Sequence, residues 1–474
     1  MTRSFTVLLG CCLCFPAIAR MAPPAVDPVA AQVAAPASDP ARQALDAWLA
    51  AFNSNDRKQL EAFRDRYQPD MDVEGMLAFH QMTGGFQLLR REPSAPGSAR
   101  ALLQEQDSDT VAMLKTTVQA GKPLALDVDR AERPADLRIP RLDQAAAIDA
   151  LAARAGAAAK RDDFAGVVLV ARGDKVLLQR AWGLADRKAG TPVTPETKFR
   201  LGSMDKMFTA VATLQLVEAG KLSLDGTVGQ YLPGYPNQGV AKATIRQLLT
   251  HAGGTGDIFG PEFDAHRMSL KTHDDYVRLF GARDPEFAPG TDHRYSNYGF
   301  VLLGDIIEHV SGQSYYDYLD RYVYAPAGMN DSGSLPEDVD VPGRAHAYTR
   351  RDPSAPWSDA ADTLPYRGTA AGGGYSTAGD LLKFAQALQA GKLLSPAMLA
   401  AATRAGQGQG PSGYGFMIAD VQGVPVYGHG GGAPGMNGEL RIFPTLGEVV
   451  VALANVDPQA ATRLAEFYQE RMPL

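Results

Sequence analysis

The stretch Phe199-Arg-Leu-Gly-Ser203-Met-Asp-Lys206-Met-Phe-Thr-Ala210 decides how the rest of this chain is interpreted. Here an irregular segment becomes a long apolar helix, which we expect to run to about Ala219 and to stop at Gly220. Ser203 and Lys206 then share one helix face one turn apart, so the amine can reach the hydroxyl. A desolvated lysine amine without its proton is a base that can make serine a nucleophile. Such pairs are also common between solvated helix neighbours, so the prediction depends on what the chain supplies elsewhere.

Length and composition favour a globular protein of several domains. A chain of 474 residues predicts two or three of them. Hydrophobic residues make up 45% and charged residues 21%, which is typical of soluble proteins. The net charge of -7 gives no reason to expect nucleic acid or an anionic membrane surface as partner.

The N-terminus predicts an export signal over residues 1–19. Arg3 supplies positive charge, residues 5–15 are apolar, and Ala17-Ile18-Ala19 offers a cleavage site. We therefore expect a periplasmic or secreted protein without a transmembrane anchor after signal removal. Residues 8–11 resemble a lipoprotein box, but the apolar stretch before them is short, so soluble export is favoured.

The cysteines exclude several kinds of chemistry. All three lie inside the predicted signal, at Cys11, Cys12 and Cys14. The mature protein would have no disulfide, thiol nucleophile or cysteine metal site.

A small α+β domain is predicted over residues 41–134, after a linker rich in Ala and Pro over 20–40. Three helices precede four strands in this domain. The helices are expected at 41–53, 57–67 and 73–81, and the strands at 85–90, 101–106, 110–119 and 123–128. This order resembles the NTF2-like cone fold that is often fused to enzymes.

The second domain, over 145–474, is predicted to be one sheet closed by distant segments with a helical insertion at about 205–370. A helix at 144–160 precedes a hairpin at 166–171 and 175–183. The middle of the chain favours helices, and its end returns to strands. The helices are expected at 244–251, 274–280, 297–310, 315–324 and 377–388, the strands at 413–420, 424–427, 439–443 and 449–455, and a last helix at 458–472.

Tyr295-Ser296-Asn297 is the second candidate part of a site. A tyrosine close to a lysine ammonium can hold or relay a proton, and the asparagine offers an amide to a substrate carbonyl. The alternative is an aromatic residue and an N-cap at a helix start, because the apolar run 300–307 follows.

His429-Gly430-Gly431-Gly432 is the third part, directly after the strand expected at 424–427. Successive glycines let a substrate backbone lie against a strand edge and leave N–H groups free to point into a cleft. The alternative is a glycine-rich turn between strands. The spacing of Gly430, Gly432 and Gly435 also fits a dinucleotide fingerprint, but that motif needs a helix next and another strand follows.

The three parts in this order resemble the penicillin-recognising serine hydrolases, of the class C β-lactamase, D,D-peptidase and family VIII esterase type. The resemblance covers about residues 145–474. It is supported by flanking stretches at 248–254, 287–290 and 372–377. It implies an α+β, β-lactamase/transpeptidase-like fold, with an antiparallel sheet flanked by helices and an inserted all-α domain.

The resemblance also implies an acyl-enzyme cycle that needs no metal or organic cofactor. Ser203 would attack a carbonyl and lose its proton to Lys206, Tyr295 or both. The backbone N–H groups of Ser203 and Gly432 would form the oxyanion hole. Asn297 would orient the acyl group, and water activated by the lysine and tyrosine would hydrolyse the ester.

The third motif departs from the family. β-Lactamases of this type usually carry Lys-Thr-Gly, where this chain has His429, Gly430 and Gly431. A substrate anion loses an ammonium and a hydroxyl partner, which favours an ester, an amide or a D-amino-acid peptide as substrate. The alternatives are a weak β-lactamase and, in another class, a catalytically reduced protein that binds or senses penicillin or peptidoglycan.

Overall fold

The computed structural model describes residues 39–350, 355–406, 410 and 412–474. The signal predicted at 1–19 lies outside these residues, and so does the linker predicted at 20–40 apart from its last two positions. Within the described ranges, no helix is long and apolar enough to cross a bilayer.

The chain first forms three helices and a four-stranded antiparallel sheet, in the order β1-β2-β3-β4. This confirms the helices and strands expected over 41–134. The helices are α1 (Pro40–Asn53), α2 (Arg57–Tyr67) and α3 (Val73–Thr83). The strands are β1 (Phe86–Glu92), β2 (Ser98–Glu105), β3 (Val111–Thr117) and β4 (Ala125–Ala131), followed by the short η1 (Ala135–Leu137).

This N-terminal unit has a core of its own. Asp39 caps the start of helix α1, where its side chain accepts a hydrogen bond from the Ala41 N–H. Its apolar face carries Trp48 and Phe52, which stack with ring centroids 4.7 Å apart. Phe52 also stacks on Phe86 from β1, at 5.4 Å. All three rings are buried, so helix and sheet are joined by aromatic packing.

A six-stranded antiparallel sheet with the order β13-β14-β15-β16-β5-β6 is the centre of the second unit. Strand β16 pairs with β5, so the end of the chain lies beside residues almost 300 positions earlier, as Val451 opposite Leu169 illustrates. This confirms the sheet closed by distant segments. Its strands are β5 (Gly166–Arg172), β6 (Lys175–Trp182), β13 (Met417–Val421), β14 (Val424–Ala433), β15 (Met436–Phe443) and β16 (Glu448–Ala454).

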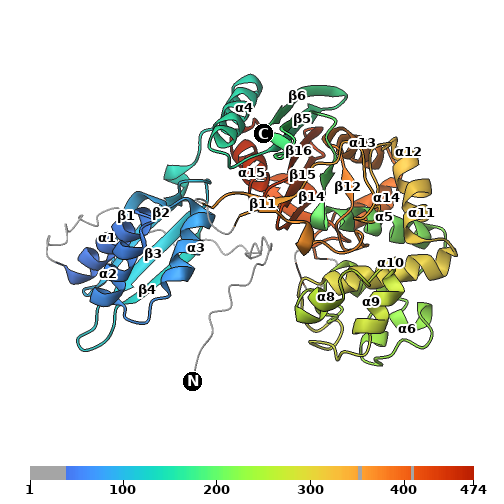
Figure 1. Cartoon of the computed structure of the whole chain (residues 1–474), viewed down its shortest axis with the longest axis horizontal. Coiled ribbons are helices and arrows are strands. Elements are labelled where there is room, and N and C mark those ends of the chain that lie inside the picture. The colour runs from blue at the N-terminus through green and yellow to red at the C-terminus, as the bar shows by residue number, and fades with distance from the viewer. Residues whose placement is uncertain (1–38, 351–354, 407–409, 411) are drawn as a thin grey trace, which may run out of the picture.

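The two faces of this sheet bury different helices. Side chains alternate along β5, so Val167 and Leu169 enter one core while Val168 and Val170 enter the other. The second core is closed by α4 and α15, and the first contains α5 and α13 (Figure 1). These helices are α4 (Gln144–Lys160), α5 (Asp205–Glu218), α13 (Ala378–Gln389) and α15 (Thr462–Arg471).

The segment between α5 and α13 is mainly helical, as expected for the insertion at about 205–370. Short strand pairs lie outside the six-stranded sheet: one precedes α5, one lies within this segment, and one joins a strand before α5 to a strand before α13. The helices are α6 (Val228–Tyr231), η3 (Val240–Lys242), α7 (Ile245–Leu249), α8 (Pro261–His266), α9 (His273–Phe280), α10 (Asn297–Ser311), α11 (Tyr315–Leu319), η4 (Asp320–Tyr324), α12 (Ala325–Ala327), η5 (Ala361–Thr363) and, after α13, α14 (Pro396–Ala402). The strand pairs are β7 (Leu184–Asp186) with β8 (Thr191–Pro192), β9 (Phe199–Arg200) with β12 (Tyr375–Ser376), and β10 (Tyr348–Thr349) with β11 (Ser358–Asp359).

Several predicted boundaries are wrong. Strand β13 begins only at Met417, because the Gly413 N–H bonds back to the Phe416 carbonyl in a turn. The final helix begins at Thr462 instead of residue 458. The Asn437 side chain accepts hydrogen bonds from the N–H groups of Ala461 and Thr462 and so caps the helix there. The helix expected at 315–324 is α-helical only to Leu319 and continues as the π-helical segment η4.

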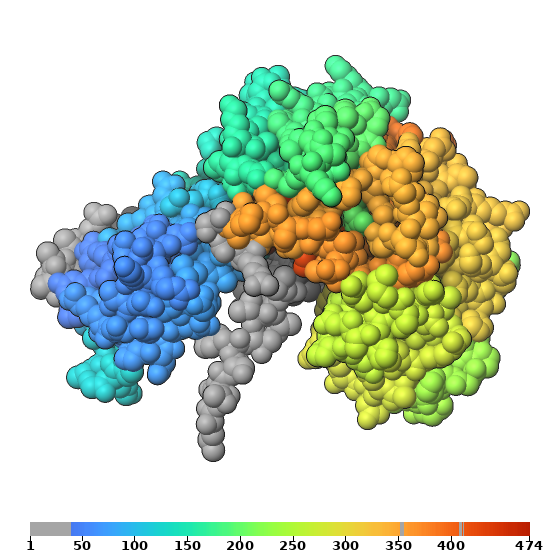
Figure 2. All heavy atoms as spheres, viewed as in Figure 1, coloured from blue at the N-terminus to red at the C-terminus, as the bar shows by residue number. Residues whose placement is uncertain are grey.

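Acidic residues of the loop between β2 and β3 join the two units. Asp109 accepts two hydrogen bonds from the Arg471 guanidinium of α15, at 2.5 and 3.1 Å. Asp107 pairs with Arg463 at 3.4 Å, and its carbonyl accepts from Arg154 of α4 at 2.7 Å. Figure 2 shows the blue N-terminal unit beside the teal segment that opens the second unit. The contact is therefore polar and involves helices on the face opposite α5.

We expect Asp109→Asn to weaken this contact by about 1–3 kcal/mol, because the paired carboxylate is largely buried. The connector at 135–142 should then be cut faster by proteases, and the N-terminal unit should melt separately in calorimetry. Asp129→Asn is the control, since it removes an exposed ion pair with Lys115 inside the same sheet. Identical melting and proteolysis of the two variants would contradict the expectation.

Candidate active site

Ser203 lies in a single 3-10 turn, η2 (Gly202–Met204), and not in the α-helix as predicted. Helix α5 begins two residues later, so Lys206 is in its first turn. Gly202 has φ +53°, and an added Cβ there would lie 2.9 Å from the Gly432 nitrogen. The left-handed backbone and the close neighbour both require glycine, and they force the chain into a tight turn before the helix.

Lys206 is completely buried. Its Nζ donates to Asn297 Oδ1 at 2.7 Å and to the Ala371 carbonyl at 2.6 Å. The same nitrogen lies 4.8 Å from the centre of the Tyr295 ring and 5.5 Å from that of Phe300. Lys206 thus meets Tyr295 and Asn297, although 91 residues separate it from Asn297 in the chain.

Burial lowers the pKa of Lys206 from 10.5 to about 7, although the carboxylates of Asp257 and Asp205 act in the opposite direction. A large fraction of the amine is therefore unprotonated near neutral pH. A neutral amine has two N–H groups and one lone pair. Because Asn297 and Ala371 take the two N–H groups, the lone pair is available to accept a proton.

Asn297 is held in one orientation by its neighbours. Its Nδ2 donates to the two carboxylate oxygens of Asp257, at 2.9 and 3.2 Å, while Oδ1 faces Lys206. Sequence reasoning missed Asp257, which lies in a loop without a recognisable pattern. The nearest signal was the glycine-containing stretch 248–254 just before it.

His251 contacts both the backbone and the tyrosine ring of the second motif. Its backbone is left-handed, with φ +57°, and its Nδ1 accepts a hydrogen bond from the Ser296 N–H at 3.1 Å. The His251 and Tyr295 rings pack with centroids 4.4 Å apart. Burial, and then the charge of Lys206, hold the pKa of His251 well below its usual value. This histidine is therefore a neutral acceptor beneath the tyrosine.

The third motif lies inside β14 and not after a strand ending at 427, so the expected boundary is wrong. Gly430, Gly431 and Gly432 pair with β15 opposite Glu439, Gly438 and Asn437. Glycine has a low strand propensity, which hides this extension from the sequence. The turn comes later, where Gly435 has φ +74°.

Gly431 lets β14 lie directly against the Ser203 turn. An added Cβ at this position would lie 1.9 Å from the Leu201 carbonyl oxygen and 3.0 Å from the Ser203 nitrogen. The close approach of Gly432 to Gly202 is part of the same contact. The structure thus brings the glycines of the third motif together with Ser203.

His429 is buried and uncharged. Burial lowers its pKa to about 3, and the charge of Lys206 contributes in the same direction. Its Nδ1 lies 2.5 Å from the Gly430 carbonyl, which requires the proton on Nδ1. The histidine in place of the family's lysine therefore brings no positive charge.

Asp205 faces the backbone that supports the serine turn. Its Oδ2 accepts a hydrogen bond from the Gly374 N–H at 2.5 Å, and the Gly374 carbonyl accepts from Leu201. Burial raises the pKa of Asp205 to about 7. Among the described residues, no group of three or more His, Cys, Asp or Glu side chains could hold a metal ion.

Comparison with known families identifies the second unit. A family model described as Beta-lactamase matches residues 145–471. The chain therefore belongs to the beta-lactamase family, and its second unit has the β-lactamase/transpeptidase-like fold expected from the sequence.

Curated relatives carry several different names. Penicillin-binding protein 4 of Amycolatopsis lactamdurans is 31% identical over 61% of this chain and 80% of its own length. Esterase EstB of Burkholderia gladioli is 34% identical over 53% of this chain and 74% of its own. Penicillin-binding protein 4* of Bacillus subtilis is 35% identical over 36% of this chain, and this chain spans only 38% of it.

Solved structures agree with these matches. A penicillin-binding protein from Bacillus halodurans aligns with a TM-score of 0.60 and 30% identity, over 66% of this chain and 98% of that one. A D-stereospecific amidohydrolase from a Streptomyces species aligns with a TM-score of 0.57 and 29% identity, over 69% of this chain and 98% of that one.

We expect Gly431→Ala to lower kcat/KM by roughly 100-fold or more, because its methyl group would push β14 away from Ser203. Gly379→Ala is the control. It lies in α13, where the nearest atom to an added Cβ is 3.8 Å away. Full activity of a folded Gly431→Ala protein, measured with an activated ester, would show that the contact is not needed.

Proposed function

We propose that this protein is an exported serine hydrolase that works through an acyl-enzyme on Ser203. Its substrate would be an ester, an amide or a D-amino-acid peptide. The observation that carries the proposal is the buried Lys206 amine, three residues after the serine, which is held by Asn297 and the Ala371 carbonyl. A fully buried lysine with its pKa near 7 is suited to accept a proton at neutral pH.

In the proposed first step, the Ser203 oxygen bonds to the substrate carbonyl carbon while its proton passes to Lys206 or Tyr295. The N–H groups of Ser203 and Gly432 donate to the oxyanion, and the Asn297 amide orients the acyl group. The tetrahedral intermediate then expels an alcohol or amine, which takes up the proton. Water attacks the serine ester in the second step and gives a proton to the same pair. The bond between the acyl carbon and the Ser203 oxygen then breaks, this oxygen takes the proton back, and the acid leaves.

The electrostatics of the third motif support this choice of substrates. His429 is neutral and Gly430 has no hydroxyl, so neither offers the partners that a β-lactam carboxylate would need. The similarity to proteins named esterase and D-stereospecific amidohydrolase points in the same direction. We infer a periplasmic or secreted mature protein from the export signal that the sequence predicts over residues 1–19.

We expect kcat/KM for an uncharged ester to rise with pH through an apparent pKa of about 7. Below this pH Lys206 is protonated and cannot accept the serine proton. Asp205→Asn should move this acid limb to lower pH, because the Asp205 carboxylate raises the pKa of Lys206. The exposed Asp420→Asn serves as control. If kcat/KM does not change between pH 5.5 and 8.5, which is roughly 1.5 units on either side of the Lys206 pKa, lysine is not the base.

The direct test is labelling with a fluorophosphonate. We expect one label per chain. In Ser203→Ala this label should be lost, and the rate of ester hydrolysis should fall at least about a thousandfold. Ser358→Ala, on an exposed serine, should behave like the wild type. Labelling that survives Ser203→Ala would refute the nucleophile. Labelling without turnover of any substrate would instead favour the binding or sensing protein.

The same preparation can be compared on short nitrophenyl esters, D-alanyl peptides and nitrocefin. We expect an ester or a D-peptide to be the best substrate. If nitrocefin is turned over faster than all of them, the interpretation of His429 and Gly430 is wrong and the protein is a β-lactamase.

A further inference from the structure

The backbone segment 369–374 is the part of the site that no catalytic motif explains. The Ala371 carbonyl accepts from Lys206, and the Ala370 carbonyl accepts from the Thr209 hydroxyl at 2.7 Å. The Gly373 N–H donates to the Gly202 carbonyl at 3.2 Å. The segment therefore touches both the lysine and the serine turn.

Where it meets Lys206, this segment is a tight turn closed by two backbone hydrogen bonds between Thr369 and Gly372, at 2.8 and 3.0 Å. Strand β12 begins only at Tyr375, and Gly372 and Gly373 have φ +151° and +100°. The two bonds set the shape of the turn, but the glycines after it make the backbone permissive, so the position of the turn relative to Lys206 depends on contacts with other elements.

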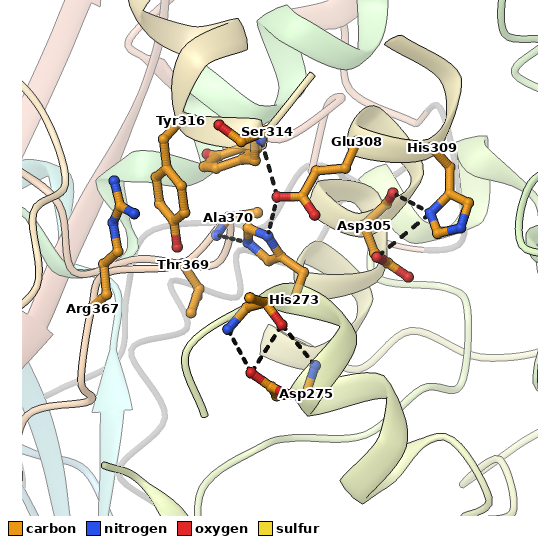
Figure 3. Close-up of polar contacts among 12 residues, drawn as sticks. His273, Asp275, Asp305, Glu308, His309, Ser314, Tyr316, Arg367, Thr369 and Ala370 are labelled. Atoms are coloured by element: carbon orange, nitrogen blue, oxygen red, sulfur yellow. Dashed lines mark hydrogen bonds and ion pairs between the residues drawn. The ribbon is translucent and has the colours of Figure 1, made fainter. Parts of the chain in front are cut away.

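His273, the first residue of α9, supplies such a contact. Its side chain is buried, and Nε2 accepts a hydrogen bond from the Ala370 N–H at 3.0 Å. Its Nδ1 lies 3.2 Å from Glu308 Oε1 in α10 (Figure 3). Because Nε2 accepts, the ring proton must be on Nδ1. This N–H group donates a hydrogen bond to the Glu308 carboxylate.

Glu308 is itself held in place. Its Oε1 also accepts from the Tyr315 N–H at 3.0 Å, at the start of α11. The contact with His273 counts among the causes that keep the pKa of this carboxyl below its usual value despite burial. Gly304 gives the imidazole its space, since an added Cβ there would lie 2.7 Å from Nε2. Three helices thus fix the position and the tautomer of one ring.

We propose that His273, oriented by Glu308, is a positioning residue that sets the direction of the Lys206 amine. It acts by fixing Ala370 and, through the backbone, the neighbouring Ala371 carbonyl. This inference rests on the proposed function, in which Lys206 is the base. With the Ala371 acceptor displaced, the amine turns about its remaining bond to Asn297, and its lone pair no longer faces one fixed direction.

The test compares three variants on the best substrate. His273→Leu keeps an apolar side chain but removes the acceptor, and we expect kcat to fall roughly 10- to 100-fold while KM changes less than about threefold. His273→Gln can accept from Ala370 and donate to Glu308, so we expect it to recover most of kcat. His309→Gln is the matched control. That ring lies in α10, is about half exposed, and contacts Asp305, as Figure 3 shows.

Glu308→Ala gives a second measurement if His273→Leu does not fold. It should lower kcat because, without the carboxylate, the His273 proton is no longer held on Nδ1. Wild-type kcat in folded His273→Leu or Glu308→Ala would overturn the inference, and so would a His273→Gln protein as slow as His273→Leu. These results leave the proposed function intact as long as Ser203→Ala is inactive. An inactive wild type overturns both, because no base is then being positioned.

Discussion

The site depends on the burial of one amine. Lys206 has no exposed surface, and its Nζ reaches two acceptors that lie 91 and 165 residues away in the chain. A buried ammonium is costly unless it is well paired, so the group responds by losing its proton near neutral pH. The same burial that destabilises the charged lysine suits it to the role of base that we propose. This chemistry exists only once α5, α10 and segment 369–374 have packed together.

The second constraint is steric and concerns the approach of β14 to the serine turn. Gly431 and Gly202 allow two backbones to pass where a single methyl group would collide with the Leu201 carbonyl or the Gly432 nitrogen. Backbone N–H groups can act on a substrate oxygen only if no side chain stands between them and the nucleophile. The glycines of the third motif therefore let β14 lie close to the serine turn, and the pairing of β14 with β15 holds them in place.

Much of the fold could be predicted, because apolar periodicity and caps mark helices such as α2 and α4, whose bounds agree with the expectation. The motifs also pointed to Lys206, Tyr295 and Asn297, which the structure brings together. The missing parts have no residue signature. Ala371 contributes a backbone carbonyl, Asp257 lies in an irregular loop, and the strand through Gly430 to Gly432 is concealed by the low propensity of glycine. Contacts of this kind are decided by tertiary packing.

The distribution of charge explains why the third motif differs from that of typical β-lactamases. His251 and His429 both lie close to Lys206, and its charge lowers the pKa of each in addition to burial. A second cation in this confined space would further reduce the proton affinity of the lysine. With both histidines neutral, the acidic neighbours Asp257 and Asp205 can keep the pKa of Lys206 near 7. Under the proposed function, the site lacks a cationic anchor for substrate anions and keeps its base unprotonated near neutral pH, which fits the proposed ester, amide or D-peptide substrates.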